Sequence, residues 1–398
     1  MYSQGDIEEA VAAGALAPEQ AASLRSFVAA QNRTPHSSEE YFRLVRGYND
    51  VFVAIACLLA LSALGWLGAL IPIGRRGMDI GAGAPSVFGT IFVAAGAWGL
   101  AEIFARARRT ALPSFLLTLY FAFSAAMVFA VIAATASVHP GTMALLTGGS
   151  FAIGAAATWG FWLRFRVPVA PMASLGLGVI AVSAIIGFIF ARSVHGPNVI
   201  NVVLFLMGVG LFVYAMKVDL EDRWRITERS EVAFWLHSLA GLVLILPLAY
   251  FLGLFRNDWS VVSSIVMLGL FLLFTLIALL IDRKVYVVSC LMPLGFALYA
   301  MFQQGQRAAT YGSGYGGPTT SPYAGGYGTP PYGGSQTAMQ TMLTNIMWPI
   351  LIIAILMVLL AIFWAPLRRA VVGILPPGAR AGLPGVEATP LEQARPFQ

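Results

Sequence analysis

The chain alternates between long apolar runs and short polar segments. About 20 apolar residues are enough to cross the hydrocarbon core of a bilayer as a helix. The sequence contains runs of this kind at 51–73, 86–104, 112–136, 143–163, 167–191, 198–216, 232–254, 260–281, 285–302 and 343–365. The fourth and fifth runs are separated only by RFRVP, and the eighth and ninth only by DRK, but these charges require a turn at the surface. The pattern predicts an all-α, polytopic transmembrane helical bundle of about ten spans.

Composition excludes a soluble globular domain. Of the 398 residues, 58% are hydrophobic and 11% are charged, against roughly 25% charged residues in a typical soluble domain. The first apolar run begins only at Val51 and is too long for the hydrophobic core of a signal peptide, so we expect it to be retained as an anchor. The chain carries 24 Lys and Arg against 18 Asp and Glu. This excess follows the loops and does not indicate a nucleic acid partner.

The basic residues predict an orientation, because cytoplasmic loops retain Lys and Arg. With the N-terminus inside, nineteen of them fall in cytoplasmic segments: Arg25, Arg33, Arg43, Arg46, Arg106, Arg108, Arg109, Arg164, Arg166, Lys217, Arg223, Arg225, Arg229, Arg283, Lys284, Arg368, Arg369, Arg380 and Arg395. The outer loops hold the other five: Arg75, Arg76, Arg192, Arg256 and Arg307. We therefore expect both termini in the cytoplasm.

The polar segments divide the chain into further parts. Residues 1–50 read as a small helical cytoplasmic head, with Gly14 as a helix stop, Pro18 as a first-turn residue and Ser37 with Glu40 as a capping box before an interfacial helix. Residues 51–302 form nine spans, 303–342 a disordered outer loop rich in Gly, Tyr and Pro, 343–365 the tenth span, and 366–398 a disordered cytoplasmic tail. The charged run at 217–232 is either an interfacial helix or solvated loop, or a docking surface for a cytoplasmic partner.

The segment TYGSGYGGPTTSPYAGGYGTPPYGG, residues 310–334, contains no charge. Its glycines and prolines disfavour helix and strand, and its few large aliphatic side chains cannot offset the entropy of ordering. We expect it to lie outside, either as a flexible tether or, through its five tyrosines, as a contact segment for the membrane surface or an envelope partner.

No nucleotide, metal or hydrolase motif is present, and we expect neither catalytic residues nor a cofactor nor a metal. Ionisable residues in spans are functional hypotheses by default, because they are costly in a membrane. Five of them lie near the predicted cytoplasmic face: Asp50, Glu102, Glu231, His237 and Asp282. Each has a structural explanation, such as helix capping for Asp50 or an ion pair with Arg106 for Glu102. The alternative is a polar pocket formed by Asp50, Glu102, His237 and Asp282.

Small residues predict close helix packing in the fourth span. Gly148, Ala152, Ala156 and Gly160 recur every four residues. Such a stripe lets the backbone of a neighbouring helix approach.

Four stretches, AVAAGALAPEQAASL, RGYNDVFVAIA, SEVAFWLH and LIDRKVYVVS, resemble those of an uncharacterised family of predicted polytopic bacterial inner-membrane proteins with a short helical head. The resemblance implies a bacterial inner-membrane location and makes Asn49, Asp50, His237 and Asp282 family-type positions. It implies no activity, and the Gly/Tyr segment is a departure from it.

Two function classes follow from these features. The first is a permease-like protein that handles a small molecule or lipid through the polar pocket. The second is an envelope scaffold or sensor-like protein that binds envelope or cytoplasmic proteins through the head, the 217–232 loop and the outer loop. We expect membrane lipids as partners in either case, and an intramembrane enzyme ranks third.

Overall fold

The computed structural model describes residues 10–14, 16–21, 23, 48–71, 86–135, 140–221, 228–253, 260–312, 334–376, 378 and 383. Within these ranges, only the backbone is described at 133–135, 140–141, 228, 261, 303–312 and 334–345. The chain divides into two compact units, Met1–Arg43 and Leu44–Gln398. The predicted capping box at Ser37, most of the charged run after Glu221, the centre of the Gly/Tyr segment and the end of the tail lie outside the described residues.

In the first unit, the described residues are helical at 10–12 and 18–21. Gly14 has a φ of +71°, a left-handed conformation that glycine adopts without strain, and it follows the first helical stretch as a C-terminal stop. The side chain of Gln20 accepts a hydrogen bond from the Ala17 N–H at 3.2 Å, which caps the second stretch just before Pro18. These local signals agree with the predicted helix stop and start.

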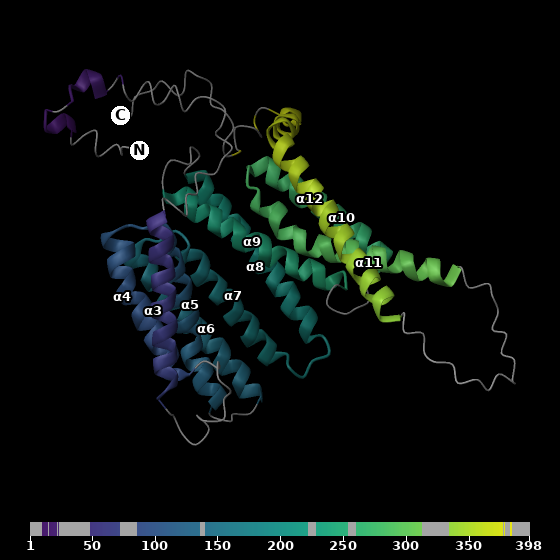
Figure 1. Ribbon diagram of the computed structural model, residues 1–398, viewed down its shortest axis with the longest axis horizontal. Helices are drawn as coiled ribbons and strands as arrows, with labels where there is room; N and C mark the ends of the chain where they lie inside the picture. Colours follow the sequence, from purple (N-terminus) through teal and green to yellow (C-terminus); the bar gives the residue numbers. More distant parts are fainter. Residues whose placement is uncertain are drawn as a thin grey trace. The chain divides into compact units, whose positions relative to one another are not determined.

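In its described part, the second unit consists of helices joined by turns and loops (Figure 1). Its helices are α3 (Tyr48–Ala69), α4 (Val87–Ala101) with the π-helical continuation η1 (Glu102–Ala107), α5 (Ala111–Thr135), α6 (Pro140–Phe165), α7 (Ala170–Ile189), α8 (Gly196–Glu221), α9 (Glu228–Phe251), α10 (Val261–Ile281), α11 (Val285–Gly312) and α12 (Gly334–Ile374). Among the described residues, ten helices are long and apolar enough to cross a membrane. The prediction of a polytopic helical membrane bundle is confirmed.

Helices α11 and α12 extend well beyond the predicted spans. Helix α11 continues to Gly312 and α12 begins at Gly334, so both enter the range 303–342 that we predicted as a loop. Helix α12 also continues to Ile374, beyond the predicted end of the tenth span at 365. The added residues include Gln, Arg and Ala, which favour helix once a neighbouring turn is formed.

The second unit contains two hydrophobic clusters built by different helices. One draws its buried residues from α3 to α7, among them Leu61, Leu117 and Phe161. The other is built by α9 to α12 around Phe271, Leu294 and Trp364. A smaller cluster of α7, α8 and α9 side chains connects them. The second unit thus forms a first helix group, α3 to α7, and a second helix group, α8 to α12, which meet along α7, α8 and α9.

Glycines set the closest crossings. A Cβ atom added to Gly68 of α3 would lie 2.4 Å from the Gly89 backbone nitrogen of α4, and one added to Gly154 of α6 would lie 2.6 Å from the Ala126 Cα of α5. Since real Cβ atoms do not approach backbone so closely, these helix pairs pack backbone to backbone.

The predicted small-residue stripe of α6 is only partly a packing face. Gly148 faces α7, where an added Cβ would lie 2.9 Å from Ile185. Ala152 and Ala156 are exposed, and no neighbour lies within 4 Å of a Cβ added to Gly160. The tight face toward α5 instead runs through the buried residues Ser150, Gly154 and Thr158, which are displaced by two positions from Ala152, Ala156 and Gly160. Composition alone did not distinguish the two faces because both consist of small residues.

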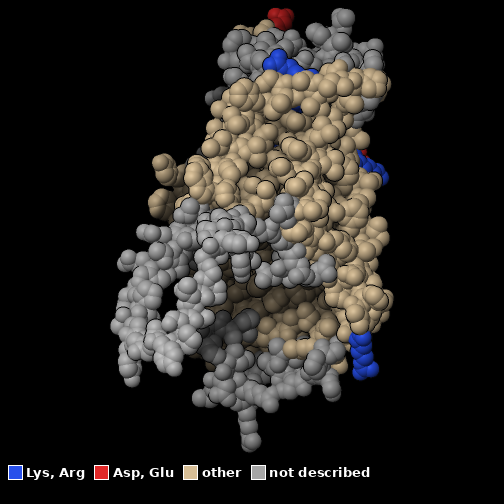
Figure 2. All heavy atoms as spheres, turned by 90° about the vertical axis from the view of Figure 1, so that its right-hand side faces the viewer, with Lys and Arg blue, Asp and Glu red and all other residues tan. Residues whose placement is uncertain are grey.

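The surface of the second unit is broadly apolar. Seen from the right-hand side of Figure 1, uncharged residues cover almost all of the described face (Figure 2). Only 6% of the most apolar stretch of α12 is buried, and large side chains such as Ile362 and Ile355 are more than half exposed. This surface suits contact with lipid.

Candidate functional site

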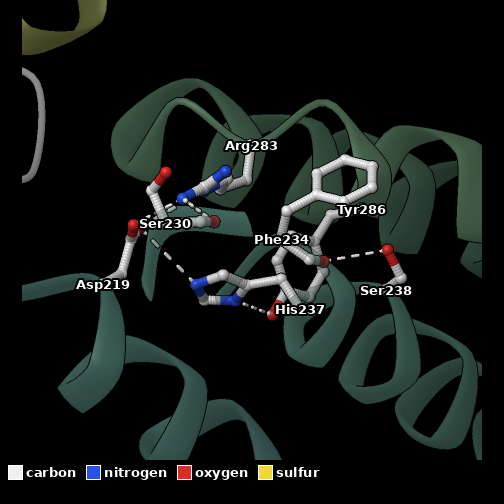
Figure 3. Close-up of polar contacts among 7 residues, drawn as sticks. All are labelled: Asp219, Ser230, Phe234, His237, Ser238, Arg283 and Tyr286. Carbon is white, nitrogen blue, oxygen red and sulfur yellow. Dashed lines mark hydrogen bonds and ion pairs between the residues drawn. The ribbon is translucent and has the colours of Figure 1, made fainter. Parts of the chain in front are cut away.

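Four buried polar side chains from separate elements converge at one end of the second helix group (Figure 3). Asp219 lies in the last turn of α8, His237 in α9, Arg283 in the turn between α10 and α11, and Tyr286 in the first turn of α11. Their exposed fractions are 0%, 0%, 2% and 1% respectively. We call this group the buried polar cluster.

Helical periodicity carries Asp219 into the interior. Gly208, Leu211, Ala215 and Asp219 are the buried residues along the second half of α8, each three or four positions from the next. Residues at this spacing share one face of a helix. Asp219 therefore continues an otherwise apolar buried stripe, although it belongs to a charged stretch of sequence.

The turn between α10 and α11 directs two adjacent side chains to different partners. Asp282 follows the end of α10 in the left-handed conformation, with φ 55° and ψ 47°. The Arg283 N–H then donates to the Ala278 carbonyl at 3.0 Å, which closes the helix end. Beyond this turn, the Arg283 side chain contacts α8 and α9, while the Asp282 side chain contacts α12.

Arg283 and Asp219 form a two-pronged ion pair. The Arg283 Nη2 lies 2.5 Å from Asp219 Oδ1, and its Nε lies 3.3 Å from Oδ2. Nη2 also faces the Ser230 carbonyl of α9 at 3.4 Å. Paired geometry of this kind is the strongest arrangement available to a guanidinium and a carboxylate, and it joins α8, α9 and the α10–α11 turn.

His237 connects the ion pair to α11. Its Nδ1 is 2.8 Å from the Tyr286 hydroxyl, and its Nε2 is 3.6 Å from Asp219 Oδ2. With Tyr286 donating to Nδ1, the neutral imidazole carries its proton on Nε2, the nitrogen that faces the carboxylate. The rings of Phe212 and Phe274 pack against His237 and Tyr286, so apolar side chains surround the polar atoms.

Asp282 belongs to a second group of contacts. The Trp364 indole N–H of α12 donates to Asp282 Oδ1 at 3.0 Å, and the Arg368 Nε lies 3.5 Å from the same oxygen. The Lys284 ammonium lies 5.7 Å from the centre of the Trp364 ring. These contacts attach α12 to the α10–α11 turn.

Glu102 and Asp50 lie elsewhere. Glu102 accepts from Arg164 of α6 at 2.9 Å and from Arg106 of η1 at 3.3 Å, at a site where the exposed fractions of the three side chains range from 33% to 56%. Asp50 is 7% exposed in the first turn of α3, a helix that packs against α4 and α5. Of the four residues proposed as one pocket, Glu102, His237 and Asp282 thus have different partners in three separate groups.

His237 was predictable as a candidate because a histidine stands out in an apolar run. Asp219, Arg283 and Tyr286 were not predicted as site residues. The four-residue spacing of Leu211, Ala215 and Asp219 is the signal that identifies Asp219. No sequence signal separates Arg283 from Lys284, because only the left-handed backbone of Asp282 decides which of them faces the interior.

Among the described residues, no group of three or more His, Cys, Asp or Glu is placed to hold a metal ion. The buried polar cluster contains one carboxylate, one imidazole, one phenol and one guanidinium. These groups can form ion pairs and hydrogen bonds with one another or with a polar ligand. Two shallow apolar grooves lie on outer helix faces, one along α8 between Val213 and Glu221 and one along α12 between Leu356 and Ala370.

Comparisons of the chain with protein-family models, with characterised proteins and with solved structures give no match.

Proposed function

We propose that this membrane protein is permease-like and handles a small molecule or a lipid, with the buried polar cluster acting as a closed gate at one end of the second helix group. The observation that carries the proposal is the convergence of Asp219, His237, Arg283 and Tyr286 from four elements in a site that is at most 2% exposed. Charge buried among membrane helices is a functional hypothesis by default, because it is costly to place there.

The energetics favour a role beyond holding helices together. A buried ion pair recovers its desolvation cost only with good geometry, and apolar side chains of similar volume often stabilise a fold equally well. The Asp219–Arg283 pair becomes favourable to keep if the protein uses a second state in which the two charges separate and bind water or a ligand.

The chain around the cluster suits such a movement. Arg283 sits on a short turn that is also attached to α12 through Asp282, so movement of α12 bears directly on the ion pair. Pro247 in α9 and Pro293 in α11 remove backbone hydrogen bonds within the two helices that carry His237 and Tyr286. Such prolines are sites at which a helix bends.

The proposed setting is the inner membrane of a bacterium, with the cluster at the cytoplasmic end and without catalytic chemistry. The helix ends on the same side of the bundle as the cluster carry more Lys and Arg than the opposite helix ends do, which supports this orientation. The resemblance to an uncharacterised family of predicted inner-membrane proteins supports the location.

The test separates a gate from a purely structural ion pair. Asp219→Leu combined with Arg283→Met removes both charges while keeping volume, so the double variant should remain folded and abundant. Cells that lack the protein, cells with the wild type and cells with the variant are compared by metabolite and lipid profiling at equal protein abundance. A gate predicts that the variant profile departs from that of the wild type.

The matched control is the exposed pair of Glu221 and Arg229, which joins the end of the same helix, α8, to α9 at 2.7 Å. Glu221→Gln with Arg229→Gln should leave the profile unchanged. Full restoration of the wild-type profile by the Leu/Met variant would show that the buried pair is structural and would remove the basis for a gate.

A scaffold is the second candidate, and the closed packing of the cluster favours it. The two grooves along α8 and α12 are lined by none of the four residues of the buried polar cluster. A scaffold predicts that the Leu/Met variant behaves as the wild type and that a defined protein co-purifies with both at the same ratio.

A further inference from the structure

A group of exposed arginines surrounds the point where the ends of η1 and α6 meet. Arg106, Arg108 and Arg109 lie at the end of η1, and Arg164 and Arg166 lie at the end of α6. All five are exposed. Glu102 bonds to both Arg106 and Arg164, which holds the two helix ends side by side. We call these five residues the arginine patch.

The patch carries a large excess of positive charge. Glu102 is its central acid and is shared between two guanidinium groups, at 3.3 Å and 2.9 Å. Within the described residues, no ion pair joins Arg108, Arg109 or Arg166 to a carboxylate. An anion that approached this end of the bundle would meet several guanidinium groups at once.

Two of the guanidinium groups are held in place by aromatic rings. Arg166 lies over the Trp162 ring at 4.9 Å from its centre, and Arg108 lies over the Phe104 ring at 5.9 Å. Phe104 and Trp162 both pack against the core cluster of the first helix group. Stacking of this kind restrains an arginine side chain while its N–H groups stay open to a ligand.

The backbone at the patch is unusual for arginine. Arg109 and Arg166 have φ values of 49° and 55°, the left-handed region. A helix commonly ends in this conformation on Gly or Asn, and an L-residue with a Cβ pays roughly 1–2 kcal/mol for it. Both helix ends use arginine where glycine would fold with less strain, which indicates that the side chains serve a purpose other than ending the helices.

We propose that the arginine patch binds the phosphate of an acidic phospholipid, one whose headgroup carries a net negative charge. The patch lies at the ends of two apolar helices, Val87–Ala107 and Thr142–Phe165, which is the level of the headgroups for membrane-spanning segments. Arginine is the side chain best suited to phosphate because its planar fork donates two parallel hydrogen bonds. Basic groups between the ends of membrane helices are a known arrangement for acidic headgroups. This assignment does not depend on the proposed gate or on which side of the membrane the patch faces.

The left-handed arginines allow a test that separates ligand binding from folding. In the full chain, Arg109→Gly with Arg166→Gly removes two guanidinium groups and also relieves backbone strain. The variant should therefore fold at least as stably as the wild type. Each basic group near a membrane surface contributes about 1 kcal/mol to binding acidic lipid, so the loss of two should weaken binding about thirtyfold, a factor of ten being about 1.4 kcal/mol.

The measurement is the fraction of detergent-purified protein that carries lipid in native mass spectrometry, titrated with phosphatidylglycerol and separately with phosphatidylcholine. The matched control is Arg192→Gly, which removes an exposed arginine from the turn between α7 and α8, at the other end of α7. We expect the wild type and the control to prefer phosphatidylglycerol and the double variant to lose that preference.

Three results would overturn the proposal. One is equal phosphatidylglycerol binding by the double variant and the wild type, and another is a wild type that shows no preference between the two lipids. The third is displacement of the lipid by inorganic phosphate or an acidic peptide at equal concentration, which would assign the patch to a soluble anion or to a protein partner.

Discussion

Arg283 is 2% exposed and forms an ion pair with the carboxylate of Asp219. Removing that carboxylate leaves a buried guanidinium without the charge of Asp219. Breaking a buried pair from one side costs about 3–5 kcal/mol. Replacing both members of a buried pair by apolar side chains costs much less stability than removing one member. Single and double substitutions of Asp219 and Arg283 therefore measure what the ion pair contributes.

We predict that Asp219→Asn lowers stability by about 3–5 kcal/mol, because Arg283 stays charged and loses its partner. The double change to Asp219→Leu with Arg283→Met should recover most of that loss. Thermal unfolding in detergent measures both. Glu221→Gln serves as the control, since its pair with Arg229 is exposed and contributes little. An Asp219→Asn variant that unfolds at the wild-type temperature would show that the ion pair contributes nothing.

His237 offers a second prediction at this scale. His237→Ala removes a ring with no exposed surface and its 2.8 Å bond to the Tyr286 hydroxyl. We expect a loss of about 3 kcal/mol from the cavity and the lost hydrogen bond. His195 lies exposed in the turn before α8, so His195→Ala should leave the unfolding temperature unchanged. Equal effects of the two substitutions would contradict the buried position of His237.

Helix α6 shows what an element adds to its residues. Its face toward α5 carries Ser150, Gly154 and Thr158, and Ser150 bonds across to the carbonyl of Ala126 and the N–H of Ala130. Gly154 sits between these contacts, where α5 comes closest. Gly160 of the same helix faces open space.

We predict opposite effects for the same substitution at these two glycines. Gly154→Ala places a Cβ 2.6 Å from the Ala126 backbone and should destabilise the protein by about 1–3 kcal/mol, since the two helices must separate. Gly160→Ala meets no atom and should gain up to about 1 kcal/mol from helix propensity. Unfolding temperatures of the two variants in detergent give the comparison. If Gly160→Ala lowered the unfolding temperature as much as Gly154→Ala does, the predicted stripe that contains Gly160 would be a packing face after all.

At the scale of the whole molecule, the ten spans were predictable because bilayer thickness fixes the length of an apolar run. The turns marked only by RFRVP and DRK were also predictable, since charges cannot remain in the hydrocarbon core. The ion pair of Glu102 with Arg106 was predictable from their spacing of four residues, but the partners of polar residues on other helices were not. Asp282 and Arg283 are neighbours in sequence, yet they contact α12 and α8 because one residue adopts a left-handed backbone. Such directions depend on tertiary packing, which no local pattern encodes.

The contacts between helix ends bear on topology. Glu102 near the end of α4–η1 bonds to Arg164 at the end of α6, and Asp219 at the end of α8 bonds to Arg283 just after α10. In each of these two contacts, the C-terminal ends of two helices that are separated by one other helix lie on the same side of the bundle, as expected if successive helices alternate in direction. The alternation assumed in counting basic residues is therefore built into the packing of both helix groups.

We predict that this side is the cytoplasm. Nineteen Lys and Arg fall on it or on the chain termini and five on the other side, and an even number of spans places both termini together. A reporter fused after Gln398 should be active only in its cytoplasmic form, and a reporter inserted within 139–142, at the start of α6, only in its external form. Reversed activities would place the arginine patch and the buried polar cluster at the outer face. Seven helices, α6 to α12, lie between the two reporters, and an odd number of spans places them on opposite sides of the membrane. The same compartment for both reporters would therefore contradict this number of spans.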